Sequence, residues 1–423
     1  MNAALPRGDP ADSAHRLAGR ALIVANPAQL PPFHSGGAQV LSRMLRPIVP
    51  SDYVTVSFGV AAGEGAPMPE LPGKRYRLDT DWSPLHRVPG YPLATIRSIR
   101  LYIAEAARRG KILAEVARRE RCASIVATSS STPDFIAATI AARLARIPLA
   151  YYLLDDWSQL VAAALPAFRN FASFAQPWLV SRAAATMVIS PLLAVELERD
   201  YAVAPVVVNH PLPYETVPEV EPVDLPWPHE PGRLSIVFTG RVYDAHYDSL
   251  ISLLGALELP GMEGATLHVY TASTASELEA HGVRGRMILH APVPGPQLRE
   301  IQRDADILLL PLGFATPYPE IVRTAVPTKT AEYLAAGRPI LVHAPANSYL
   351  ATLATRDGAA AVVSSPDPAQ LADAIRMIAG DADYRRALIA GALRAALKYH
   401  SPEVTTARFR RVLDRIVTEA AAR

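Results

Sequence analysis

Short apolar runs separated by amphipathic stretches recur along almost the whole chain. The runs are four to six residues long, rich in Val, Ile and Leu, and do not alternate strictly with polar residues. Continuous apolar runs of this length are typical of strands buried on both faces of a parallel sheet. Stretches with helical period lie between most of them, which is the βαβ pattern. The sequence therefore predicts an α/β protein built from parallel sheets.

The runs fall into two sets, one on each side of a proline-dense segment at 211–232. At 423 residues the chain is too long for one ordinary core, so each set predicts its own doubly wound, Rossmann-like domain. The proline-dense segment predicts a stiff, extended linker. The predicted organisation is a tail at 1–20, a first domain at 21–210, the linker, a second domain at 233–400 and a helix at 401–423 that packs back on the first domain.

Bulk properties narrow the class of protein. The net charge is only +2, which gives no strong field toward nucleic acid. The single cysteine, Cys122, excludes an internal disulfide and fits a reducing compartment. The first apolar run is too short for a signal peptide, and no run approaches the roughly 18 residues of a membrane span. We therefore expect a cytoplasmic protein.

Several familiar site fingerprints are missing from the sequence. There is no G-x-G-x-x-G after the first strand, no Walker loop, no H-E-x-x-H, no paired C-x-x-C and no G-x-S-x-G. A dinucleotide dehydrogenase is therefore disfavoured, and we expect neither a bound cofactor nor a metal held by the protein.

The segment "PTKTAEYLAAGRPILV" at 327–342 joins a helix-start signal to a buried strand. Thr328 predicts an N-cap, which leaves the amides of Lys329 and Thr330 free to hold a phosphate, with the lysine charge beside them. Glu332, about one turn further, suits the hydroxyl groups of a ribose. The alternative is a capped helix with a solvated lysine and glutamate.

The segment "FTGRVYDAHYD" at 238–248 ends a buried strand at Gly240 and Arg241. Glycine allows close approach of a ligand, and the guanidinium group is a rigid phosphate fork. A glycine at a strand end followed by a surface arginine is the equally probable structural explanation.

Two further places in the first domain end predicted strands with polar or flexible residues. Gly36 and Gly37 follow the first strand and would let a ligand or the other domain come close. Asp155 and Asp156 end the run at 149–154, and acids at the carboxyl end of a central strand often serve function. The alternatives are an ordinary helix-opening turn and a loop-starting pair of acids.

Taken together, these motifs resemble the retaining GT-B glycosyltransferases of the family-4 type. "FTGRV" is similar to the opening of the family's second domain, and "PTKTAEYLAAGRPI" to its P-[ST]-K-x-x-E-Y-x-A-x-G-x-P-[VI] signature. "DADILLLPL" at 304–312 and "VISPLLAVELERDYAV" at 188–203 also look like the family's pattern. The resemblance runs from about Ala21 to the C-terminus and implies two domains that face each other across a cleft.

The resemblance implies a role for each matching residue. Arg241, beside Gly240, would contact the diphosphate of a nucleotide-sugar donor, and Lys329 would neutralise the charge of the leaving group. The distal phosphate would lie on the amides next to Thr328, and the ribose would lie on Glu332.

In the first domain, the resemblance places Gly36 and Gly37 in the loop that faces the diphosphate. It places Asp155 or Asp156 near the reacting sugar, as a catalytic candidate beside Arg241 and Lys329.

The match departs from the family where the donor sugar would bind. The first glutamate of the family's E-x7-E falls on Thr324, and Glu320 is nearby but out of register. The usual lysine after G-R is missing, and His246 occupies roughly its position. These three residues are therefore weaker candidates for the donor sugar.

The resemblance implies transfer of a sugar from a nucleoside diphosphate to a glycan, a lipid-linked glycan or a small molecule, with retention and without a metal. A role in polysaccharide biosynthesis would fit such an acceptor. A sugar-nucleotide epimerase of the same fold and a non-catalytic binding protein remain alternatives. Basic helices at 97–121 leave open a peripheral contact with anionic lipid on the inner face of the membrane.

Overall fold

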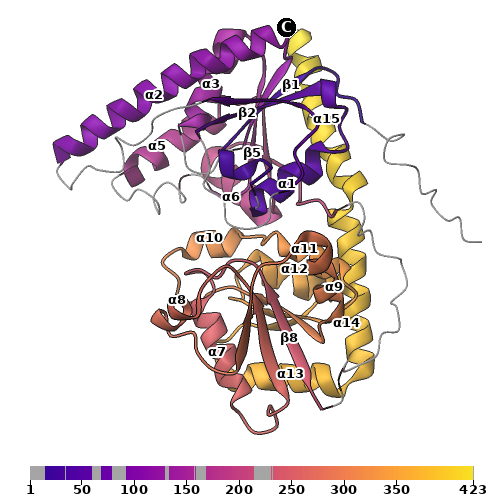
Figure 1. Ribbon diagram of the computed structural model, residues 1–423. Helices are drawn as coiled ribbons and strands as arrows, with labels where there is room; N and C mark the ends of the chain where they lie inside the picture. The colour runs from indigo at the N-terminus through magenta and orange to yellow at the C-terminus, as the bar shows by residue number, and fades with distance from the viewer. Residues whose placement is uncertain are drawn as a thin grey trace, which may run out of the picture.

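The structure is a computed structural model that describes residues 15–33, 35–59, 68–78, 92–128, 133–156, 158, 168–213, 230 and 232–422. It holds two parallel sheets with helices on both faces, one in each half of the chain (Figure 1). The predicted α/β class with two doubly wound domains is confirmed.

The first sheet has seven strands in the order β3-β2-β1-β4-β5-β6-β7, and its paired neighbours run parallel. Its strands are β1 (Ala21–Ala25), β2 (Tyr53–Phe58), β3 (Lys74–Leu78), β4 (Ser124–Thr128), β5 (Leu149–Leu153), β6 (Ala185–Val188) and β7 (Val206–Val207).

Helices of the first half cover both faces of this sheet. They are α1 (Gly36–Leu45), α2 (Pro92–Arg119), α3 (Asp134–Ala145), α5 (Arg169–Val180) and α6 (Pro191–Tyr201), with short 3-10 turns η1 (Pro27–Gln29) and η2 (Pro50–Asp52). Apolar side chains of α2, α3 and α5 pack on one face, and those of α1 pack on the other.

The second sheet has six strands in the order β10-β9-β8-β11-β12-β13. They are β8 (Leu234–Thr239), β9 (Ala265–Tyr270), β10 (Met287–His290), β11 (Ile307–Pro311), β12 (Ile340–His343) and β13 (Ala361–Val363). The helices are α7 (Tyr247–Leu257), α8 (Ala275–Ala280), α9 (Gly295–Asp304), α10 (Pro319–Thr324), α11 (Lys329–Ala335), α12 (Tyr349–Asp357), α13 (Pro368–Gly380), α14 (Ala382–Ala395), the π-helical turn η6 (Ala396–His400) and α15 (Pro402–Ala421).

Both sheets reverse their strand order beside their first strand. β1 lies between β2 and β4, and β8 lies between β9 and β11. Ligands of open parallel sheets bind outside the carboxyl ends of the strands at such a reversal. The segments that follow β1 and β8 are therefore where a site is expected, and they contain Gly36 and Gly240.

The last helix returns to the first domain. In Figure 1, α14 and α15 run as a column along both halves of the molecule, ending beside the first sheet. Phe409, Val412, Leu413 and Ile416 of α15 are buried in the same cluster as Ile23 of β1. Residues 402–421 are thus part of the first core.

The chain passes between the two halves twice, and the two crossings are bonded to each other. His400 Nδ1 lies 2.7 Å from the carbonyl oxygen of His210, and the Leu212 amide donates to the carbonyl oxygen of His400 at 2.8 Å. Both imidazoles are buried, and burial lowers the pKa of His210 to about 3 and that of His400 to about 4.

This crossing predicts acid sensitivity. In the unfolded chain both imidazoles take up protons near pH 6.5, whereas in the folded protein they stay neutral until much lower pH. The unfolded state then binds more protons, so the free energy of unfolding should fall as pH drops from about 6.5 toward 4. Urea titrations at pH 7 and pH 5 measure this loss. The double variant His210→Gln/His400→Gln should lose less stability between pH 7 and pH 5, whereas His281→Gln, an exposed control, should lose as much as the wild type. Equal losses in the wild type and both variants would show that the two buried histidines do not cause the acid sensitivity.

One strand was not predicted from the sequence. β3 has the sequence KRYRL, and its side chains are only partly buried at the edge of the first sheet. Charged edge strands lack the apolar run that marks a buried strand.

Most of the predicted linker, 214–229 and 231, lies outside the described residues, as does most of the predicted tail.

Candidate functional site

The candidate site lies where α11 begins opposite the carboxyl end of β8. Gly240 has φ +117°, and a Cβ atom there would lie 3.4 Å from both Cε and Nζ of Lys329. The Lys329 ammonium lies 3.7 Å from the ring centroid of Phe238, within cation–π distance. The glycine thus leaves space for a lysine side chain that folds back over the end of the strand.

Burial changes the acid–base behaviour of this lysine. Desolvation lowers the pKa of Lys329 to about 7, and the nearby carboxylate of Glu332 only partly opposes it. The same environment lowers the pKa of the buried His246, first by desolvation and then by the charge of Lys329. His246 packs on the rings of Phe238 and Tyr243. An anionic ligand here would restore the full charge of Lys329.

Arg241 follows Gly240 directly, and its side chain is exposed. Its charge acts on the phenol of Tyr243 and on the carboxylate of Glu277 at the start of α8. The structure therefore places a permanent cation at the rim of the site, next to the buried lysine.

Glu332 contacts the other domain. One carboxylate oxygen accepts a hydrogen bond from Arg43 Nη2 of α1, and the other accepts one from Gln302 Nε2 at 3.3 Å. Both members of the ion pair are largely buried, with side chains 14% and 10% exposed. Arg43 also donates to Gln39 Oε1 at 3.0 Å and to the Pro211 carbonyl oxygen at 3.4 Å. Neither Arg43 nor Gln302 was predicted from the sequence, because neither lies in a local motif that indicates a binding site.

The glycine pair of the first domain approaches the second. Ser35 caps α1 through its hydroxyl, which accepts from the Ala38 amide at 3.1 Å. A Cβ atom on Gly36 would lie 2.7 Å from Thr328 Oγ1, so any other residue at this position would collide with the second domain. Gly37 instead lies against Gln29 of its own domain.

The prediction that Thr328 caps the start of α11 is wrong. Thr328 has helical angles, φ −55° and ψ −33°, and its side chain makes no capping bond. A capping side chain needs an extended backbone to reach the free amides. The Thr330 amide, expected to be free, donates to the Pro327 carbonyl oxygen at 2.8 Å. Phosphate contacts by Thr328, Lys329 and Thr330 stay a prediction, and the Thr330 amide would have to leave its bond to Pro327 to make one.

The two aspartates after β5 face different surroundings. Asp156 accepts from the hydroxyl group of Ser158 at 2.7 Å, and its charge acts on Glu196 and Tyr201 of the same domain. Asp155 acts instead on the phenol of Tyr243 in the second domain. Desolvation, with the charge of Asp156, raises the pKa of Asp155 to about 7. The charge of Asp155 therefore acts toward the second domain, whereas that of Asp156 acts within its own domain.

The residues proposed for the donor sugar are engaged elsewhere in this structure. Thr324 is buried; its carbonyl oxygen accepts from Ser190 of the first domain at 3.1 Å, and its hydroxyl group donates to the Glu320 carbonyl oxygen at 3.3 Å. The Glu320 carboxylate pairs with Arg323, which also pairs with Glu196 across the cleft. A sugar contact by either residue stays a prediction.

The part of the chain that the structure describes holds no group of three His, Cys, Asp or Glu side chains arranged as metal ligands. Arg241 and Lys329 bring positive charge to the carboxyl end of β8, and Arg43 approaches Glu332 from the first domain.

Residues 233–381 match the family model described as "Glycosyl transferases group 1". No curated protein matches the chain.

Solved structures with a similar fold cover nearly the whole chain. HepE of Anabaena, in complex with UDP and glucose, is 12% identical over 94% of this chain and 100% of its own, with a TM-score of 0.61. Sucrose-phosphate synthase of Thermosynechococcus elongatus is 12% identical over 95% and 100%, with a TM-score of 0.64. A glycosyltransferase of Rickettsia africae is 9% identical over 95% and 99%, with a TM-score of 0.60. The chain therefore has the GT-B fold, and its second half matches the family model of the group 1 glycosyltransferases.

Proposed function

We propose that the protein transfers a sugar from a nucleoside diphosphate sugar to an acceptor, with retention of configuration. The observation that carries the proposal is the Lys329 ammonium, folded over Phe238 beneath Gly240 and next to the exposed Arg241. A leaving nucleoside diphosphate gains negative charge as its bond to the sugar breaks, and two fixed cations stabilise that charge. The UDP and glucose bound to Anabaena HepE support a donor of this class.

The remaining roles follow from position. Glu332 receives the ribose, because each of its oxygens keeps a lone pair after accepting from Arg43 and Gln302. Asp155, whose pKa lies at about 7 and whose charge acts toward the second domain, holds a hydroxyl group of the reacting sugar. With Arg241 and Lys329 neutralising the diphosphate, activity should survive removal of divalent metal by EDTA.

The acceptor is a glycan, a lipid-linked glycan or a small molecule, as expected from the sequence. A lipid-linked acceptor would suit α2, whose solvent face carries Arg97, Arg100 and Lys111 beside Leu101 and Ile103, which are 44% and 45% exposed. None of the helices in the described part of the chain has the length and apolar character needed to cross a bilayer.

A thermal-shift panel of UDP-, GDP-, ADP- and dTDP-sugars tests the donor class. A ligand at ~100 times its Kd should stabilise the protein by about 2.7 kcal/mol. Release of the nucleoside diphosphate with a free or transferred sugar would support a transferase, and interconversion of two sugar nucleotides would instead show an epimerase. No shift with any member of the panel would refute the donor site.

The role of Glu332 predicts a loss of ribose recognition. With the nucleotide identified by the panel, Glu332→Ala should weaken binding by about 10- to 100-fold, the range for a hydrogen bond to a charged group. It should weaken the 2′,3′-dideoxy analogue far less, because that analogue lacks both hydroxyl groups. Glu300→Ala, an exposed change on α9, is the control. Equal losses for both ligands would show that Glu332 acts only in domain packing.

A further inference from the structure

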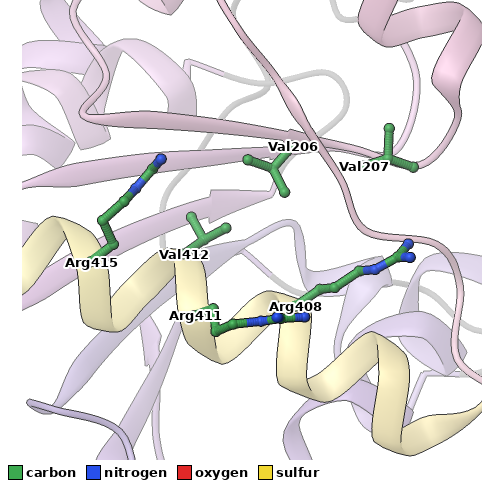
Figure 2. Close-up of a pocket in the computed structure, with 6 residues that line it drawn as sticks. All are labelled: Val206, Val207, Arg408, Arg411, Val412 and Arg415. Atoms are coloured by element: carbon green, nitrogen blue, oxygen red, sulfur yellow. The ribbon is translucent and has the colours of Figure 1, made fainter.

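A hollow on the first domain lies between the edge of the sheet and the returning helix. β7 is the outermost strand of its sheet and pairs only with β6 among the described strands. α15 passes beside it, and the two border an open hollow of about 450 Å³. None of the candidate donor-site residues lines this cavity. Its lining residues are Val206, Val207, Arg408, Arg411, Val412 and Arg415 (Figure 2).

Three arginines of one helix face gather here. Arg408, Arg411 and Arg415 are spaced three and four residues apart, so they share one side of α15 and span about 10 Å of its length. In Figure 2 the side chains of Arg415 and Arg408 extend away from α15, whereas that of Arg411 lies along the helix. Like charges at this spacing destabilise a helix, unless an opposite charge lies among them.

Among the described residues that line the hollow, none has an acidic side chain to compensate these charges. Arg415 Nε lies 4.0 Å from the Glu419 carboxylate, at the limit of an ion pair. Arg411 Nε donates to the Ala407 carbonyl oxygen at 3.3 Å, and Arg408 Nη1 to Asn209 Oδ1 at 3.4 Å. Arg411 and Arg415 are exposed, so an incoming ligand can reach them. The hollow therefore carries a cluster of positive charge. Two of its arginines bond to neutral oxygen atoms, and the ion pair of the third is long.

The shape of the hollow limits what can bind. Its volume lies within the roughly 300–1,000 Å³ typical of small-molecule sites. Val206 and Val412 give it an apolar side next to the charged groups, whereas Val207, the next residue of β7, packs on the opposite face of the sheet. Guanidinium groups bind phosphate through paired hydrogen bonds, and several of them spaced along a helix can hold more than one phosphate. With a net charge of only +2, the whole chain offers no comparable attraction for a long polyanion.

We infer that this cavity, which we name the β7–α15 groove, binds a small organic ligand that carries two or more phosphate groups. The phosphates lie on Arg408, Arg411 and Arg415, and the carbon skeleton lies on Val206 and Val412. The groove is independent of the proposed donor site, because the two share no residue.

Isothermal titration with glucose 1,6-bisphosphate tests the groove, with glucose 6-phosphate and glucose as comparison ligands. The bisphosphate should bind most tightly, the monophosphate more weakly and the neutral sugar not at all. Arg411→Gln with Arg415→Gln should weaken bisphosphate binding by at least about tenfold, since each removes a charged hydrogen-bond donor. Both side chains are exposed, and Arg415→Gln alone, which should give a smaller loss, serves as a milder variant.

Two control variants test whether the ligand binds in the groove or elsewhere on the protein. Arg410→Gln changes a neighbouring arginine of α15 that does not line the cavity, and it should leave binding unchanged. Lys329→Met removes the central charge of the donor site, and it should also leave bisphosphate binding unchanged. Loss of binding in Lys329→Met but not in the groove variants would assign the ligand to the donor site and overturn the inference. Absence of binding to wild-type protein, or binding only to vesicles of anionic lipid, would overturn it equally.

Discussion

Replacing Lys329 by methionine should lower kcat/KM for the donor by about 10²- to 10³-fold, the cost of removing one group that stabilises developing negative charge. Methionine keeps much of the length and the apolar contact with Phe238, so the fold around Gly240 should remain. Release of the nucleoside diphosphate, followed with the donor identified by the panel, measures the effect. Most of the loss should lie in kcat, because the charge being stabilised grows toward the transition state.

The same lysine predicts how donor binding depends on pH. In the free protein, burial lowers the pKa of Lys329 to about 7, so at pH 8 most molecules carry a neutral amine. A bound diphosphate favours the ammonium form, and binding must then take up a proton. Affinity should therefore fall as pH rises above 7. Calorimetry at pH 8 in two buffers of different ionisation enthalpy measures the uptake, which should vanish in Lys329→Met.

Lys111→Met, an exposed change on α2, is the matched control for both measurements. If Lys329→Met retained the wild-type kcat/KM, the assignment of the leaving-group charge to this residue would be wrong. The remaining cation at the rim, Arg241, would then carry that role.

The second large effect concerns stability. Arg109 of α2 and Asp134, the first residue of α3, form an ion pair at 2.8 Å with side chains 3% and 1% exposed. Arg109 also bonds Glu105 at 2.8 Å and lies over the ring of Phe58. Asp134→Ala leaves a buried guanidinium group without this partner, so the free energy of unfolding of the first domain should fall by about 3–5 kcal/mol.

Urea unfolding, followed by a probe in the first domain, measures this loss, since two domains need not unfold in one transition. Asp373→Ala is the control, because Asp373 and its partner Arg376 have side chains that are 75% and 42% exposed. This change should alter the free energy of unfolding by no more than about 0.5 kcal/mol. Similar small losses in both variants would show that the buried pair adds nothing beyond a surface one.

Local patterns were enough to predict most of the fold. Apolar runs mark buried strands, and the runs ALIVA at 21–25, YVTVSF at 53–58 and LSIVFT at 234–239 each coincide with a strand of the structure. The edge strand β3 was not predicted, because its sequence KRYRL has the polar composition of a loop. The place of Gly240 and Arg241 at the carboxyl end of β8 could be predicted because both directly follow that strand, and ligands of open parallel sheets bind at this end.

Contacts between distant residues could not be predicted in this way. Arg43 and Glu332 are 289 residues apart, and neither position shows locally that it has a partner. The start of α11 failed for a different reason, since Thr328 has the residue type of a cap but adopts a helical backbone. Which of two adjacent acids acts toward the second domain depends on the loop after β5, and periodicity carries no information about it.

The return of α15 to the first sheet sets an order for biosynthesis. Domains generally fold as units while the chain is made, starting from the N-terminus. Here the first core lacks Phe409, Val412 and Leu413 until residues 402–421 have left the ribosome. The second domain, complete by about residue 400, should therefore reach its native packing first. The α15-facing side of the first sheet should stay open to chaperones until α15 has emerged and packed on it.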